Sequence, residues 1–242
     1  MTDADGFFGE KVAEKYDIPN DPQFDPAVVA RTADVLADLA GGGRALEFAI
    51  GTGRVAVPLA GRGVEVHGID MSRAMLARLR PKPGAERIGV SVGDFTKTRV
   101  DGEFDLVYLV FNTIMNVTTQ RGQVAAFRNA AAHLRPGGRF LIEVMVPELR
   151  KLPPGQTAVP FTVTPTRLGF DTYEPATQAM SSVHVVDGEI SEIPFRYVWP
   201  AELDLMAQLA GMELEHRWES WSRDPFHNES DSHISTWIRP TM

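Results

Sequence analysis

The chain has no cysteine among its 242 residues. This absence excludes disulfide bonds, a thiol nucleophile and thiolate metal sites. No apolar run approaches the roughly 20 residues that a membrane-spanning helix needs, and the acidic start, Met1 to Gly6, lacks the basic and apolar regions of a signal peptide. We therefore expect a cytoplasmic protein with no membrane partner.

Basic residues are fewer than acidic ones, with 24 Lys and Arg against 32 Asp and Glu, so the net charge is −8. A protein that binds nucleic acid needs a basic surface to neutralise phosphates, and we expect no nucleic-acid partner here. The length suits one large α/β domain, or such a domain with an insertion, and it is sufficient to bury a substantial core. The sequence is also compatible with a homo-oligomer.

Apolar strands and amphipathic helices alternate through the first two thirds of the chain. A helix is predicted from about Pro26 to the glycines at 41–43, because proline suits a first helical turn and glycine ends a helix. After it we predict strands at 45–50, 64–69, 88–92, 104–110 and 139–146, and helices at 53–61, 72–80 and 120–134. Repeated β-α-β units of this kind indicate a parallel sheet with right-handed crossovers.

The character of the chain changes after Pro147, where residues 148–166 are rich in proline and threonine. Alternating segments at 179–186 and 189–198 then flank Asp187-Gly188, a strong hairpin signal. A helix at 200–210 and strands at 213–221 and 233–238 complete the predicted elements. These shifts predict one domain formed by 1–147 and 200–242, interrupted by an antiparallel insertion at 148–199.

The segment from Ala45 to Ala60 combines a short strand, a glycine turn and a helix. Gly51 and Gly53 allow a positive φ and a close approach of a ligand to the backbone, and the following helix directs its free N–H groups at the turn. Glu47 on the strand can bind a cationic amine, and Asp70 at the end of the next strand suits a ribose diol. The segment therefore predicts a site for a nucleoside cofactor.

The identity of that cofactor needs further signals. Residues 51–56 also satisfy the Gly-x-Gly-x-x-Ala dinucleotide pattern, which alone is weak evidence. An NAD(P)-dependent oxidoreductase is therefore one alternative, although a long segment precedes the loop and no Tyr-x-x-x-Lys pair follows it. A protein that binds the cofactor without catalysis is another.

Four motifs in order carry a more specific resemblance. They are Glu47-Phe-Ala-Ile-Gly-Thr-Gly53, Val66-His-Gly-Ile-Asp-Met-Ser72, Val92-Gly-Asp-Phe95 and Leu134-Arg-Pro-Gly-Gly138. Together they resemble the class I S-adenosylmethionine-dependent methyltransferases, and the overall pattern resembles bacterial small-molecule members of natural-product pathways, including sugar N-methyltransferases. The resemblance implies a Rossmann-like, seven-stranded, mostly parallel sheet with helices on both faces and a substrate lid, residues 148–199, between strands five and six.

The resemblance also implies S-adenosylmethionine as methyl donor, with S-adenosylhomocysteine as product, and it indicates which residues bind them. One position departs from the pattern, because Ala49 replaces the first glycine of the motif; we expect only a slight shift of the methionine end. Met71 and Phe95 equally suit an ordinary core, and Asp94 suits a helix cap. The implied cofactor contacts are Tyr16, Glu47, Ala49, Gly51, Gly53, Asp70, Met71, Asp94, Phe95 and Val110.

The expected reaction is methylation of an amine or hydroxyl of a small molecule, with a nucleotide-linked amino sugar of an antibiotic pathway as one candidate. Residues 111–114 lack the Pro-Pro-aromatic signature of enzymes that methylate adenine or glutamine amides. No metal is expected, because the His227–His233 segment has the composition of a solvated loop. We expect His184, Asn112 and Tyr173 to be catalytic and Asn116, Arg196 and Trp199 to face the substrate.

Overall fold

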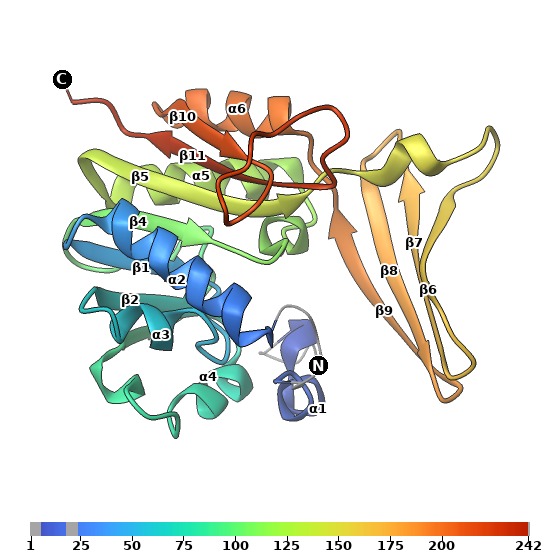
Figure 1. Cartoon of the computed structure of the whole chain (residues 1–242), viewed down its shortest axis with the longest axis horizontal. Coiled ribbons are helices and arrows are strands. Elements are labelled where there is room, and N and C mark those ends of the chain that lie inside the picture. Colours follow the sequence, from blue (N-terminus) through green and yellow to red (C-terminus); the bar gives the residue numbers. More distant parts are fainter. Residues whose placement is uncertain (1–5, 18–23, 242) are drawn as a thin grey trace.

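The computed structural model describes residues 6–17 and 24–241 and contains two β-sheets (Figure 1). A seven-stranded sheet has the order β10-β11-β5-β4-β1-β2-β3, and a four-stranded sheet has the order β6-β7-β8-β9. We call the four-stranded sheet, residues 158–196, the lid sheet. No helix in the described ranges is long and apolar enough to cross a membrane.

The large sheet confirms the predicted fold class. Strands β3, β2, β1, β4 and β5 pair in parallel, whereas β11 is antiparallel to both β5 and β10. Its central strand β4 is buried along most of its length, as its continuous apolar sequence predicts. The strands are β1 Arg44–Phe48, β2 Glu65–Asp70, β3 Gly89–Val92, β4 Phe104–Leu109, β5 Leu134–Met145, β10 Glu213–Trp218 and β11 Ser232–Ile238.

Helices cover both faces of this sheet. Apolar side chains of α2, α3 and α4 pack in one core cluster, and those of α5 and α6 pack in a second cluster on the opposite face. Trp237 and Ile234 of β11 belong to different clusters, which agrees with the alternation of side chains along a strand. The helices are α2 Pro26–Ala40, α3 Ala56–Ala60, α4 Arg73–Leu79, α5 Gln120–His133 and α6 Pro200–Leu209, with short 3-10 turns η3 Ala85–Arg87, η4 Thr113–Asn116 and η5 Glu148–Lys151.

Side-chain caps define several helix starts. The Asp25 carboxylate accepts from Ala27 N at 2.8 Å, and Ser72 Oγ accepts from Met75 N at 3.0 Å. Helix α3 begins three residues later than the predicted start at Gly53, because the glycine turn keeps Gly53 at φ 76. Strand β5 starts directly after α5, five residues before the predicted 139, and β10 ends at Trp218, three residues before the predicted 221.

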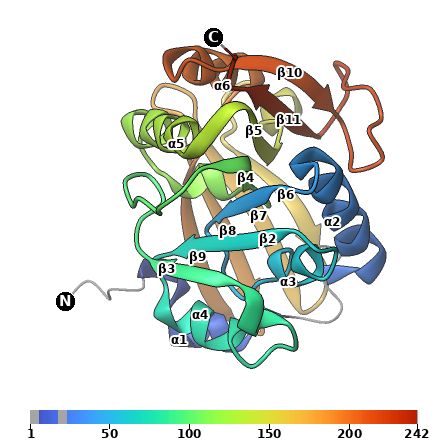
Figure 2. The same ribbon diagram turned by 90° about the vertical axis from the view of Figure 1, so that its left-hand side faces the viewer.

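The lid sheet stands beyond the carboxyl ends of the parallel strands (Figures 1 and 2). Its strands are β6 Ala158–Val163, β7 Arg167–Glu174, β8 Ala179–Val186 and β9 Glu189–Arg196, all antiparallel. The hairpin at Asp187-Gly188 confirms the predicted turn. Strands β6 and β7 were not predicted individually, because the proline- and threonine-rich sequence before them resembles a loop.

The N-terminal segment contributes a turn, η1 Gly6–Phe8, and a short helix, α1 Glu10–Glu14, that the sequence did not predict. Two hydrogen bonds attach it to the large sheet. Ser72 Oγ donates to the Phe8 carbonyl at 2.6 Å, and Thr52 Oγ1 donates to Asp17 at 2.7 Å. The segment therefore lies against the loops that follow β1 and β2, on the side that faces the lid sheet (Figure 1).

Candidate active site

The glycine turn after β1 has three residues with positive φ: Ala49 at 53°, Gly51 at 55° and Gly53 at 76°. Glycine adopts this region freely, whereas a residue with a Cβ pays about 1–2 kcal/mol. The substitution at Ala49 therefore affects the backbone energy of the turn as well as the space beside it. The expectation from sequence considered only the size of the methyl group.

Glu47 is a buried carboxyl group at this edge of the sheet. Its side chain is 3% exposed, and Tyr108 Oη donates to its Oε2 at 2.8 Å. Burial raises the pKa of Glu47 to about 8, against the lowering effects of the Tyr108 hydrogen bond and the charge of Arg54. A cationic amino group brought next to this carboxyl would stabilise its ionised form, so the residue fits the amino end of the expected cofactor.

Asp70 joins the glycine turn to the loop after β2. Its Oδ2 accepts from Gly51 N at 2.7 Å, and its Oδ1 accepts from Ser72 N at 2.8 Å. A carboxylate offers about four acceptor positions, so each of its oxygens can accept more than one hydrogen bond. Met71, the next residue, is 49% exposed. The pair therefore fits the expected ribose and adenine contacts.

Asp94 and Phe95 have partners within the protein. Asp94 Oδ1 accepts from Thr96 N at 2.9 Å and Thr96 Oγ1 at 2.7 Å. Partial burial opposes ionisation, but these bonds and the ion pair with Lys97 lower the pKa of Asp94. Phe95 stacks on Phe48, with ring centroids 5.4 Å apart, and packs against the core. These positions agree with the cap and core alternatives, and contacts of the two residues with adenine stay predictions.

The turn after β4 is held by strand β5. Phe111 and Asn112 have φ of 58° and 57°, a strained pair for residues other than glycine. Phe111 N donates to Glu143 Oε2 at 2.9 Å, and Asn112 Oδ1 accepts from Met145 N at 2.7 Å. Glu143 Oε1 also accepts from Trp221 Nε1 at 2.7 Å. Glu143 was not predicted as a site residue, because its role depends on partners far away in the sequence.

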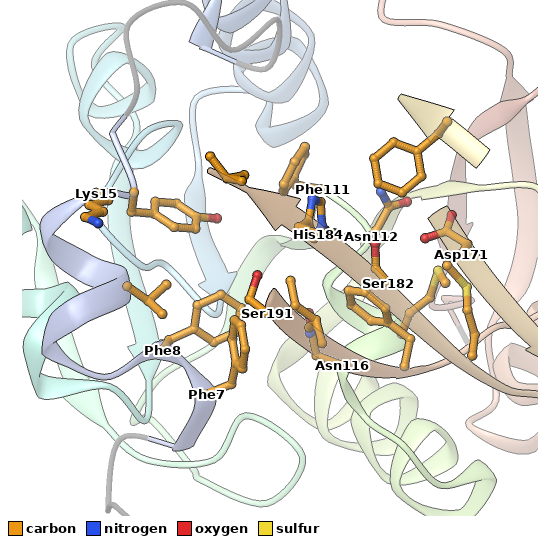
Figure 3. Close-up of a pocket in the computed structure, with 18 of the residues that line it drawn as sticks. Phe7, Phe8, Lys15, Phe111, Asn112, Asn116, Asp171, Ser182, His184 and Ser191 are labelled. Atoms are coloured by element: carbon orange, nitrogen blue, oxygen red, sulfur yellow. Dashed lines mark hydrogen bonds between the residues drawn. The ribbon is translucent and has the colours of Figure 1, made fainter. Parts of the chain in front are cut away.

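A pocket of about 1250 Å³ lies between this turn, the N-terminal segment and the lid sheet (Figure 3). Its walls combine aromatic and aliphatic side chains with amide, hydroxyl, imidazole and charged groups. Four predicted site residues line it, namely Tyr16, Asn112, Asn116 and His184. The pocket is therefore a candidate site for the acceptor molecule.

The other twelve predicted site residues do not line this pocket, and four of them have contacts that have not yet been described. Tyr173 is buried and contacts Tyr197 edge to face, with ring centroids 5.6 Å apart. Trp199, at the start of α6, contacts the other side of Tyr197 at 6.1 Å. The Arg196 guanidinium donates to Gln178 at 2.7 Å and Glu202 at 2.8 Å, and also to Gln123. Val110 is buried in the core. The contacts of Tyr173, Trp199 and Arg196 fit packing of the lid sheet on the core, and their expected roles in catalysis and substrate binding stay predictions.

Several pocket residues were not predicted. Lys11 and Lys15 come from the N-terminal segment, and Asp171 and Ser182 come from paired strands of the lid sheet. The lysines were missed because helix α1 was not predicted. The alternation of Met180, Ser182 and His184 was a usable signal, because every second residue of a strand faces the same side. In the described ranges, no group of three or more His, Asp or Glu side chains is placed to hold a metal ion.

Comparisons with known proteins agree with this geometry. The family profile described as "Methyltransferase domain" matches residues 45–138. The structure of the CcbJ methyltransferase from Streptomyces caelestis is 33% identical, covers 97% of this chain and 98% of its own, and superposes with a TM-score of 0.83. The cypemycin N-terminal methyltransferase of a Streptomyces species is 29% identical over 188 residues, which are 75% of this chain and 77% of that protein.

An amino pentose methyltransferase of Micromonospora echinaspora, solved with S-adenosylmethionine bound, shares the fold. It is 22% identical, and the match covers 86% of this chain and 89% of that chain with a TM-score of 0.64. The family profile and the match to the CcbJ methyltransferase support a methyltransferase and not the oxidoreductase alternative. The chain belongs to the S-adenosylmethionine-dependent methyltransferase family.

Proposed function

We propose that this enzyme methylates an amine of a small molecule that binds in the pocket between the turn after β4 and the lid sheet. The observation that carries the proposal is the position of this pocket, which opens beside the carboxyl ends of the strands and is enclosed by residues 158–196. In this arrangement residues 1–147 and 200–242 bind the methyl donor, and residues 148–199 cover the acceptor.

The donor site consists of groups from consecutive strand ends. S-adenosylmethionine supplies, when bound, a methyl group on a sulfonium sulfur. Glu47 would hold the amino group, the turn from Ala49 to Gly53 would pack on the methionine portion, and Asp70 would bind the ribose. Met71 and Phe95 would lie beside the adenine. The buried carboxyl of Glu47 and the exposed Met71 side chain support this assignment.

The names of relatives favour an amine over a hydroxyl acceptor. One relative is named for an N-terminal substrate and another for an amino pentose. The pocket is lined by three cationic side chains and by three acidic ones, a mixture that suits an acceptor with both a cationic and an anionic group; they are Lys11, Lys15, Arg167, Asp171, Asp187 and Glu189. A nucleotide-linked amino sugar from natural-product biosynthesis combines both features and is our first candidate acceptor.

The residues of this chain must place the acceptor nitrogen and remove its proton. Alignment of the acceptor nitrogen with the methyl group accounts for much of the rate enhancement in such a reaction, because two reactants held together in the right orientation react as if they were one molecule. Burial lowers the pKa of His184, which favours the neutral form of its ring, and the neutral ring has one nitrogen lone pair that can accept a proton. Asn112 and Asn116 line the same pocket with amide groups that can orient a polar acceptor.

An arrayed assay with methyl-labelled S-adenosylmethionine tests the proposal. Amino sugars, small amines and phenols are each incubated with the enzyme, and labelled products are separated by mass. We expect label on amino sugars or other amines. Label on phenols alone, or on none of the small molecules, would contradict it.

A further inference from the structure

A hydrogen-bonded row of three side chains crosses the inner face of the lid sheet. Asp171 on β7 pairs directly with Ser182 on β8, so their side chains share one face of the sheet. His184 is two residues further along β8 and therefore shares that face too. All three line the pocket, and Figure 3 shows them on strands that border it.

The hydrogen bonds in this row have one consistent direction. Burial raises the pKa of Asp171, and a hydrogen bond that the Ser182 hydroxyl donates to the carboxylate partly opposes this rise. Ser182 Oγ also lies 3.3 Å from His184 Nε2. Because the serine proton is directed at Asp171, His184 must donate through Nε2–H. The Nδ1 atom of His184 then carries the lone pair.

Two acceptor atoms of the row remain open. Asp171 Oδ1 is buried and has no hydrogen-bond partner within the described ranges. A buried carboxylate oxygen without a partner is costly, and a cationic donor would satisfy it. The second open acceptor is His184 Nδ1, which no hydrogen bond from the described residues reaches. Apolar side chains, including Met180, Ile193 and Phe195, line the same wall.

We propose that Asp171, Ser182 and His184 form the binding site for the acceptor ammonium, with Asp171 as its anion and His184 as the base that removes its proton. This inference rests on the proposed function and specifies how the amine is recognised. In the proton transfer, an N–H bond of the ammonium breaks and its electron pair stays on nitrogen. The proton moves to His184 Nδ1, which becomes an imidazolium, and the neutral nitrogen is then ready to receive the methyl group.

The charges around the row are mixed. Arg167 on β7 lowers the pKa of His184, which adds to the larger effect of burial. Glu148 in η5 raises the pKa of Asp171, which burial also raises. Tyr173 follows on the same face of β7. A bound acceptor ammonium beside Asp171 would favour the ionised form of the Asp171 carboxyl. Lys11 and Lys15 border the pocket from the N-terminal segment and are not part of the row.

Recognition is tested with benzylammonium and its uncharged analogue benzyl alcohol as probes. Their affinities for the protein saturated with S-adenosylhomocysteine are measured by calorimetry or saturation-transfer NMR. We expect the ammonium to bind at least about ten-fold more tightly than the alcohol, as a charge-assisted hydrogen bond would provide. Asp171→Asn should reduce this preference to about two-fold or less.

Glu192→Gln is the matched control, because Glu192 is an exposed acid of the same sheet, adjacent in β9 to the pocket-facing Ile193. It should retain the preference, and both variants should bind S-adenosylhomocysteine as the unsubstituted protein does. Equal binding of the two probes to the unsubstituted protein, or an unchanged preference in Asp171→Asn, would overturn the inference. Failure of the proposed function is a separate result, namely the absence of labelled amine in the assay above.

The base is tested with the amine acceptor that the assay identifies. For the unsubstituted enzyme, kcat should fall less steeply between about pH 9 and about pH 7 than the neutral fraction of the free amine does, because His184 takes up part of the released protons. In His184→Gln, kcat should fall about ten-fold per pH unit below the pKa of the free amine. Ser182→Ala should likewise make the fall of kcat with decreasing pH steeper, and Ser182→Thr, which keeps the hydroxyl, should restore the pH dependence of the unsubstituted enzyme. A parallel loss of rate at every pH in all three variants would assign a structural role and overturn the assignment of the base.

Discussion

At the scale of single residues, the proposed donor site contains groups that are costly for the folded protein. Glu47 is a carboxyl group with almost no solvent contact, and Ala49 has a backbone conformation that favours glycine. Both lie at the end of β1, where the chain leaves the sheet. Such costs are concentrated at functional sites, because a ligand can offset them.

Glu47 predicts a proton release on cofactor binding. Its pKa of about 8 means that the folded protein holds this proton at pH 7. A cationic amino group beside the carboxyl lowers that pKa, so binding should release up to about one proton. Calorimetry of S-adenosylmethionine binding in buffers of different ionisation enthalpy measures the release. Glu47→Gln should abolish it and weaken binding about ten-fold; an unchanged release would contradict this role.

Ala49→Gly should stabilise the protein. The substitution removes about 1–2 kcal/mol of left-handed backbone strain and adds about 0.5–1 kcal/mol of chain entropy in the unfolded state. The net gain should be about 0.5–1 kcal/mol in the free energy of unfolding, measured by urea denaturation. Ala49→Val should instead destabilise the protein, since a branched side chain is disfavoured there. A loss of stability in Ala49→Gly would show that the methyl group makes packing contacts that outweigh the strain.

The positions of the candidate site residues were predictable where the backbone pattern determines them, and their roles stay predictions. Gly51, Gly53 and Asp70 are identified by their spacing after strands, and the structure places them together. The roles of Arg196 and Glu143 were not predictable in this way, because their partners come from elements far away in the sequence. The sequence around a charged residue in a strand does not indicate whether that residue forms an ion pair with a distant element.

At the scale of secondary-structure elements, the base of the lid sheet is fixed to the core. Arg196, the last residue of β9, pairs with Glu202 of α6 at 2.8 Å, with side-chain exposures of 7% and 14%. Gln123 of α5 and Gln178 complete the set. The tip of the lid sheet has no such anchor in the described ranges, and its Ile190 is 74% exposed. We therefore expect the sheet to move as a unit about its base.

Arg196→Ala should destabilise the protein by about 3 kcal/mol, because it leaves the partly buried Glu202 carboxylate without its cation. Binding of S-adenosylhomocysteine should be nearly unchanged, since the donor residues are on other strands. Urea denaturation and calorimetry measure the two effects. If Arg196 contacts the substrate instead, the variant would keep its stability and lose only acceptor binding.

Glu143→Ala should lower kcat about ten-fold, with little effect on the affinity for S-adenosylhomocysteine. The variant removes the acceptor for both Phe111 N and Trp221 Nε1, so the strained turn after β4 loses its support. Trp221→Phe should have a smaller effect on kcat, because the hydrogen bond that Phe111 N donates to Glu143 remains. Steady-state kinetics and calorimetry distinguish the outcomes, and an equal loss in both variants would argue against a specific role of the turn.

The strands of the large sheet and the helices that cover it were predictable because the apolar residues of each element follow a clear pattern in the sequence. The lid sheet was predictable only in part, since the hairpin of β8 and β9 has an Asp-Gly turn and β6 lacks any such marker. Strand β6 contains Pro160 and lies at the edge of its sheet, a position where proline is tolerated. Its identity as a strand depends on pairing with β7 and not on its own sequence.

At the scale of the whole molecule, two sheets face each other across one pocket. The large sheet presents the ends of its parallel strands, and the lid sheet presents one face of alternating residues. Stability of this arrangement should depend on pH, because buried titratable groups occur in the core as well as at the site. His233 in β11 is fully buried, and burial lowers its pKa to about 3.

His233 predicts a loss of stability in acid. Its unfolded pKa is about 6.5, so below that pH the unfolded chain binds a proton that the folded protein excludes. The free energy of unfolding should fall by up to about 1.4 kcal/mol per pH unit below about pH 6.5. Glu47 contributes with the opposite sign, because its folded pKa is raised and its contribution falls as pH rises from 4.5 to about 8. Urea denaturation of His233→Gln should show a smaller loss between about pH 7 and about pH 5; an unchanged loss would assign it to other groups.

The central claim is that the donor binds at the glycine turn and the acceptor binds under the lid sheet. A crystal structure with S-adenosylhomocysteine and the amine found in the labelling assay tests it most directly. The account predicts the donor product beside Glu47 and Asp70, and the amine nitrogen in the pocket between Asn112 and the row from Asp171 to His184. An acceptor bound outside that pocket, or an amine that contacts neither Asp171 nor His184, would contradict it.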